Sequence, residues 1–114
     1  MVTILQVAIG GALGAVLRYF VGMSVAFPMG TMAVNVVGSF LMGMAFVYLS
    51  DRSFAPFVMI GALGGFTTFS AFSLDVFKLY ELERFWAAGG YVLGTVIGSV
   101  VALVAGIYLA RALA

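Results

Sequence analysis

The sequence contains no cysteine and no histidine, and only 8% of its 114 residues are charged. The first two absences exclude disulfides, thiolate chemistry and metal ligation by imidazole. The scarcity of charge argues against a soluble domain, in which about 25% of the residues are charged. An enzyme is the least expected class, because no histidine, cysteine or membrane-embedded carboxylate is available as a base or nucleophile. The net charge of +1 indicates no particular partner, and no nucleic-acid partner is expected.

Long charge-free runs fill most of the chain, which is 65% hydrophobic with a mean hydropathy of +1.26. These runs cover residues 1–17, 19–50, 53–74 and 85–110. Each supplies most or all of the roughly 20 residues that a bilayer crossing requires. We therefore predict an all-α membrane protein, a single domain over residues 1–114, with helices at about 2–22, 30–50, 54–74 and 85–110. No basic segment precedes the first run, so a signal peptide is not expected.

The basic residues are almost evenly divided between the two predicted sides of the membrane. Arg52 and Arg111 belong to one side, and Lys78 and Arg84 to the other, together with Arg18 if that side chain extends to the interface. An asymmetry in Lys and Arg is what orients a membrane protein. Its near absence predicts insertion in both orientations and hence an antiparallel homodimer, with a two-fold axis in the membrane plane.

The third predicted crossing contains residues that weaken a helix in the middle of the membrane. Gly64 and Gly65 are adjacent, and the β-branched Thr67 and Thr68 follow closely. A break inside the bilayer leaves backbone groups without partners, and it is tolerated only where protein buries it or where it lines a path for ions or water. The stretch 64–72 therefore predicts a broken third helix and a functional site at the break.

Several polar residues in the other crossings have two open interpretations. Arg18 either extends to the interface or supplies a cation that attracts anions and anchors a pore wall. Asn35 either clamps a neighbouring helix or presents N–H donors to an anion. Tyr91 needs a hydrogen-bond partner for its hydroxyl, and Asp75 is interpreted as solvated. Pairs of glycines four residues apart predict close helix contacts, at Gly10 and Gly14, Gly61 and Gly65, and Gly94 and Gly98.

Three motifs stand out in the first three predicted crossings: Gly11-x-x-Gly14-Ala15-x-x-Arg18-Tyr19, Gly30-Thr31-x-x-Val34-Asn35-x-x-Gly38-Ser39 and Gly64-Gly65-Phe66-Thr67-Thr68-Phe69-Ser70-Ala71-Phe72-Ser73. They resemble the motifs of the Fluc (CrcB) fluoride channel family. The third is specific, whereas the first two alone are weak. One position departs from the family pattern, since Ala71 stands where the motif usually has threonine.

The resemblance implies a bacterial inner-membrane channel that exports fluoride, built as an antiparallel homodimer with two pores and a central structural sodium ion. By matching position, the carbonyls of Gly64 and Thr67 would hold the sodium. The fluoride pore would be lined by a matching set of side chains: Asn35, Phe69, Ser70, Phe72 and Tyr91, with Arg18 nearby. Ala71 removes one hydroxyl from the polar wall of that pore, which bears on its rate or wetting.

The chemistry of these residues suits fluoride independently of the resemblance. Fluoride is strongly hydrated, so a path through the membrane must replace its water with amide and hydroxyl donors. The ring edges of Phe69 and Phe72 carry partial positive charge. No lysine or arginine lies at the middle of a span, where a full charge would bind fluoride tightly and slow its exit.

Two other membrane functions remain as alternatives. A proton-coupled multidrug transporter of similar size requires an intramembrane carboxylate, typically in its first helix, and residues 1–50 contain no Asp or Glu. A non-transporting assembly factor would explain the glycine spacings but not the polar helix break.

Overall fold

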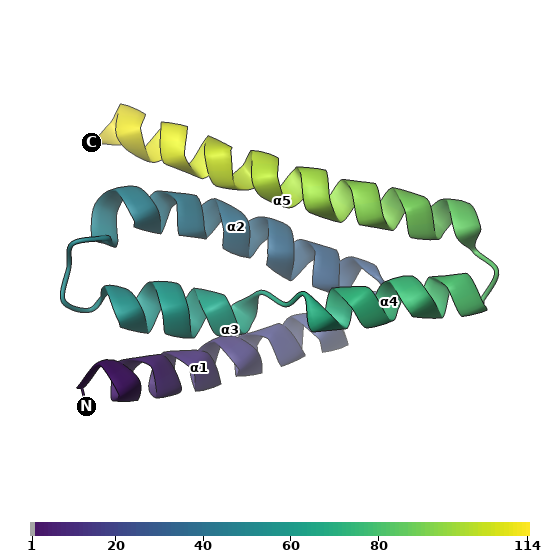
Figure 1. Cartoon of the computed structure of the whole chain (residues 1–114), viewed down its shortest axis with the longest axis horizontal. Coiled ribbons are helices and arrows are strands. Elements are labelled where there is room, and N and C mark those ends of the chain that lie inside the picture. Colours follow the sequence, from purple (N-terminus) through teal and green to yellow (C-terminus); the bar gives the residue numbers. More distant parts are fainter. Residues whose placement is uncertain (1) are drawn as a thin grey trace.

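The computed structural model describes residues 2–114 as a set of helices joined by short turns (Figure 1). Helix α1 spans Val2–Ser24 and α2 spans Met29–Leu49. The next part of the chain forms a π-helix, η1 (Pro56–Leu63), then a single turn, α3 (Gly64–Phe66), and then α4 (Ser70–Glu81). The last helix, α5, spans Phe85–Leu113. The all-α prediction is thereby confirmed.

Four helical segments are long and apolar enough to cross a membrane: α1, α2, the combined segment Pro56–Glu81, and α5. The longest dimension of the molecule is 47 Å, close to the 40–45 Å of a bilayer with its headgroups. Both termini and the turn between α2 and η1 lie at one end, and the turn between α4 and α5 lies at the other (Figure 1). This is the arrangement that four successive crossings require.

Small residues bring the helices together in two close pairs. In the first pair, α1 packs on η1, where a Cβ built on Gly10 would lie only 3.0 Å from the Cα of Gly61. In the second pair, α2 packs on α5, where a Cβ on Gly106 would collide with the backbone carbonyl oxygen of Phe40. The close helix contact predicted from the glycine pairs is therefore present between Gly10 of α1 and Gly61 of η1. Only a residue without a side chain allows the two backbones to approach this closely.

Helix α4 extends well beyond the predicted end near residue 74. Phe72, Asp75 and Leu79 follow an i, i+3, i+7 spacing and are all buried, so one face of the helix packs in the protein interior. The interpretation of Asp75 as solvated is wrong, because this residue is only 8% exposed. The charged segment after residue 74 thus combines a buried face with a solvated face that carries Lys78 and Glu81.

Candidate functional site

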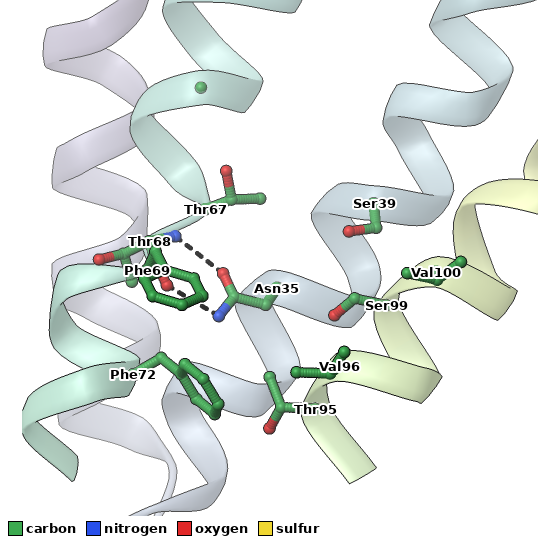
Figure 2. A pocket seen from close by; sticks show the side chains of 11 residues that line it. Asn35, Ser39, Thr67, Thr68, Phe69, Phe72, Thr95, Val96, Ser99 and Val100 are labelled. Carbon is green, nitrogen blue, oxygen red and sulfur yellow. Dashed lines mark hydrogen bonds between the residues drawn. The ribbon is translucent and has the colours of Figure 1, made fainter. Parts of the chain in front are cut away.

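Between α3 and α4 the chain leaves the helical conformation, and Asn35 of α2 fills the gap. Thr67 is extended, with φ −85° and ψ 158°. The Nδ2 of Asn35 donates to the carbonyl of Thr68 at 2.9 Å, and its Oδ1 accepts from the N–H of the same residue at 2.7 Å (Figure 2). Asn35 therefore joins two helical segments as a clamp, and it retains one amide N–H for another partner.

Thr68 also organises the start of α4. Its Oγ1 accepts a hydrogen bond from the N–H of Ala71 at 3.1 Å and lies 3.4 Å from the Oγ of Ser70. A threonine hydroxyl in this position satisfies one of the amides that a helix start leaves without a backbone partner. Ser70 is exposed and contacts Thr68 at this start.

These hydrogen bonds leave two backbone carbonyls free of their helical donors. In a continuous helix the N–H of Thr68 would bind the carbonyl of Gly64, and the N–H of Ala71 would bind that of Thr67. Both amides donate elsewhere. Residues 2–114 contain no cluster of three or more His, Cys, Asp or Glu that could hold a metal. Carbonyl oxygens suit a hard cation, so the donor set of Gly64 and Thr67 is chemically compatible with sodium.

Arg18 binds the backbone at the same interruption. Its Nε donates to the carbonyl of Gly65 at 3.1 Å, so the guanidinium points into the protein and the side chain does not simply extend to the interface. A cavity of about 360 Å³ lies beside it and includes Thr31 and Ala71 in its wall. A hydroxyl at position 71 would therefore face this cavity.

An open groove of about 450 Å³ runs along the interruption, between α2 and α5 (Figure 2). Its lining contains hydroxyl, amide and aromatic groups and no charged side chain: Asn35, Ser39, Gly64, Thr67, Thr68, Phe69, Phe72, Thr95, Val96, Ser99 and Val100. Of the side chains predicted for a fluoride pore, Asn35, Phe69 and Phe72 meet here. Arg18, Ser70 and Tyr91 are not part of this lining.

Two hydroxyls in the groove lack any hydrogen-bond partner among the described residues. They belong to Thr95, which is 4% exposed, and to Ser99, one turn further along α5. A buried hydroxyl without a partner costs about 1–3 kcal/mol, so a site of this kind calls for a functional explanation. Neither residue is among the pore residues predicted from the sequence. Their signal is a polar stripe at positions 91, 95 and 99 of an otherwise apolar helix.

The aromatic rings at the groove form a short stack. The centroids of Phe69 and Phe72 lie 5.5 Å apart at 63°, an edge-to-face arrangement. Phe72 then contacts Tyr91, at a centroid distance of 5.2 Å. Phe72 is buried, whereas Phe69 is 75% exposed and presents its ring to the outside of the chain.

Tyr91 supports this stack from behind. Its hydroxyl donates to the Oδ2 of Asp75 at 3.0 Å, and both side chains are buried. The prediction that the Tyr91 hydroxyl needs a partner is therefore confirmed, and Asp75 is that partner. Because Tyr91 contacts Phe72, the pair holds one wall of the groove in place.

Four helical segments long and apolar enough to cross a membrane, three of which line a neutral polar groove, define a multi-pass membrane protein. Residues 5–107 match the family model described as CrcB-like protein, Camphor Resistance (CrcB). The chain belongs to this family.

Curated relatives that carry the name fluoride-specific ion channel FluC match almost the whole chain, and three of them serve as examples. The protein of Cereibacter sphaeroides is 52% identical, with 96% of this chain and 94% of the relative covered. Those of Rhizobium etli and Paracoccus denitrificans are 49% and 46% identical, with at least 96% of each chain covered. All three names describe ion channels and none describes an enzyme, in agreement with the expectation from the residues.

Proposed function

We propose that this chain is a fluoride-selective passive ion channel of the bacterial inner membrane. The relatives are named for this activity. The observation that carries the proposal is the pair of buried, unpartnered hydroxyls of Thr95 and Ser99, in the same groove as the amide of Asn35. These are neutral donors with free hydrogen-bonding capacity at the place where an anion would lose its water.

The groove offers fluoride a set of replacements for its hydration shell. Thr95 and Ser99 carry O–H groups that no other residue uses, and rotation of these covered hydroxyls toward the groove would make them donors to the ion. Asn35 would donate the N–H that Thr68 does not use. The edge-to-face rings of Phe69 and Phe72 line the same groove, and aromatic ring edges attract anions. Each donor is neutral, so the ion is stabilised enough to enter and weakly enough to leave.

Passive conduction is supported by the absence of a titratable side chain from the groove lining. Proton-coupled transport requires a group within the path that gains and loses a proton. Arg18 is engaged with a carbonyl outside this lining. Fluoride would therefore move down its own gradient, and export follows whenever the inside concentration is higher.

We further propose that two copies assemble as an antiparallel homodimer with one pore per copy. Phe69 is 75% exposed and the groove is open along one side, as expected of a surface that a second copy covers. The even distribution of basic residues supports insertion in both orientations. We place the interruption at residues 67–69 within the bilayer, where the second copy would enclose it.

A structural sodium ion fits the same assembly. The carbonyls of Gly64 and Thr67 have lost their helical donors, and a sodium ion at the junction of the two copies would bind these free oxygens. The chain supplies the oxygens by redirecting two amides, through Asn35 and Thr68.

The proposed activity is tested by anion efflux from liposomes that contain the purified protein, with fluoride and chloride electrodes outside. We expect rapid fluoride release without chloride release. Replacing sodium on both sides with N-methylglucamine should slow the release if sodium holds the dimer together. No release of either ion from vesicles with verified protein insertion would contradict the channel and favour an assembly factor.

A further inference from the structure

A second groove, away from the interruption, lies at the end of the molecule where α4 meets the turn after α1. It has a volume of about 560 Å³ and is lined by Phe27, Phe77, Lys78, Glu81 and Leu82. The three apolar side chains are all substantially exposed, at 44–60%. They form an apolar trough that contains two charged groups of opposite sign, one turn apart on α4.

Neither of the two charges is paired with an opposite charge within the described residues. Within the described residues, neither Lys78 nor Glu81 makes an ion pair within 4.0 Å. The Nζ of Lys78 instead lies 5.9 Å from the centroid of the Phe27 ring, at the wall of the groove. An i, i+3 pair on a helix surface has the spacing to interact directly, yet these two groups do not pair with each other. Both charges therefore remain available to an external partner.

The groove lies at the level of the membrane interface. The solvated end of α4 and the turn after it concentrate Lys78, Glu81, Glu83 and Arg84 within seven positions of the chain. Trp86 follows at 95% exposure. Exposed tryptophan beside charged residues marks the headgroup region of a membrane protein. The occupant of this groove is therefore drawn from the lipids.

We propose that this groove binds a phospholipid whose headgroup carries a phosphate and a primary ammonium, as in phosphatidylethanolamine. Lys78 supplies a cation for the phosphate, and Glu81 supplies a carboxylate that accepts hydrogen bonds from the ammonium. The apolar walls of Phe27, Phe77 and Leu82 contact the acyl chains. A choline headgroup lacks the N–H donors, and a glycerol headgroup lacks the positive charge, so both fit Glu81 less well.

The chain offers an internal control at its opposite end. A groove of about 470 Å³ there is lined by Arg52, Ser50 and Ser53 together with apolar residues of η1, and no carboxylate is in its lining. This groove can attract a phosphate but has no group that selects for an ammonium. A change at Arg52 should therefore leave headgroup preference unaltered.

The test is native mass spectrometry of the purified protein in detergent doped with equal amounts of phosphatidylethanolamine, phosphatidylcholine and phosphatidylglycerol of identical acyl chains. The wild type should retain the ethanolamine lipid about 2- to 5-fold over the choline lipid, the ratio expected of one exposed ion pair. Glu81→Gln should bring that ratio close to one, and Glu81→Lys should shift the preference to the glycerol lipid.

Two further variants complete the design. Lys78→Gln should lower the retention of all three lipids, whereas Arg52→Gln should leave the ethanolamine-to-choline ratio at the wild-type value. Equal retention of the three lipids by the wild type would overturn the proposal. So would a preference that survives Glu81→Gln unchanged.

Discussion

The side-chain amide of Asn35 replaces two backbone hydrogen bonds that a continuous helix would make. It serves both the N–H and the carbonyl of Thr68, from a helix 33 positions away in the sequence. The amide is the right group for this task because it carries a donor and an acceptor side by side. A single residue therefore stabilises the interruption and still contributes a donor to the groove.

Asn35→Ala should destabilise the protein and reduce fluoride efflux, because it leaves both backbone groups of Thr68 without a partner. The expected loss in the free energy of unfolding is about 2 kcal/mol, measured by denaturation of the purified protein in detergent. Ser39→Ala, one turn along the same helix and in the same groove, is the control and should change stability much less. Equal stability of the two variants would contradict the clamp.

The buried pair of Asp75 and Tyr91 stabilises the protein through one hydrogen bond of 3.0 Å. Tyr91→Phe keeps the ring against Phe72 but leaves the carboxyl group of Asp75 buried without its donor. We expect a loss of about 1–3 kcal/mol in the free energy of unfolding, because a buried acceptor is left unsatisfied.

A double-mutant cycle separates this bond from general packing. Tyr91→Phe combined with Asp75→Ala should cost less than the sum of the two single changes, by about 1 kcal/mol or more. Chemical denaturation of the four proteins gives the coupling energy. Additive losses would mean that the two side chains do not interact energetically.

Close backbone contacts at glycine set the spacing of the helices within each pair. On α5, a Cβ at Gly106 would collide with the carbonyl oxygen of Phe40 in α2. A backbone carbonyl within a helix cannot move aside as the end of a side chain can. The contact therefore fixes the distance between α2 and α5, the two helices that form the outer walls of the groove.

Gly106→Ala should force α2 and α5 apart and lower the free energy of unfolding by about 1–3 kcal/mol. Gly90→Ala lies on the same helix, where nothing is within 4 Å of the added methyl group. This control should be neutral or stabilising, because alanine favours a helix by about 1 kcal/mol over glycine. Thermal unfolding of both variants in detergent makes the comparison, and similar melting temperatures would contradict the close-contact account.

Much of this architecture is predictable from the sequence, because long charge-free runs predict bilayer crossings. The glycine pairs likewise predict close helix contacts, and the Gly64-Gly65 stretch predicts an interruption of the third crossing. The role of Asn35 is not predictable, since a clamp and a donor need the same residue and differ only in what lies nearby. The buried face of α4 is not predictable either, because Lys78 and Glu81 on the opposite face of the same helix make the whole segment look solvated in the sequence.

At the scale of the whole molecule, one side of the chain exposes an aromatic ring beside an open groove. Phe69 lies at the groove and is 75% exposed, although its neighbour Phe72 is buried. The carbonyls freed at the interruption lie along the same open groove, which includes Gly64 and Thr67 in its wall. A second copy on this side would enclose both features, so assembly and conduction are expected to depend on each other.

The most direct test of the proposed fluoride path is the efflux rate of the double variant Thr95→Val and Ser99→Ala. Both changes remove unpartnered hydroxyls at nearly constant shape, so stability should be unchanged or increased. Fluoride efflux from liposomes should fall about tenfold or more, as expected for a loss of about 1.4 kcal/mol of ion stabilisation. The control is Ser24→Ala with Ser50→Ala, whose exposed hydroxyls bind the carbonyls of their own helices, and it should conduct at the wild-type rate. A stable Thr95 and Ser99 variant that also conducts at the wild-type rate would show that fluoride does not pass through this groove.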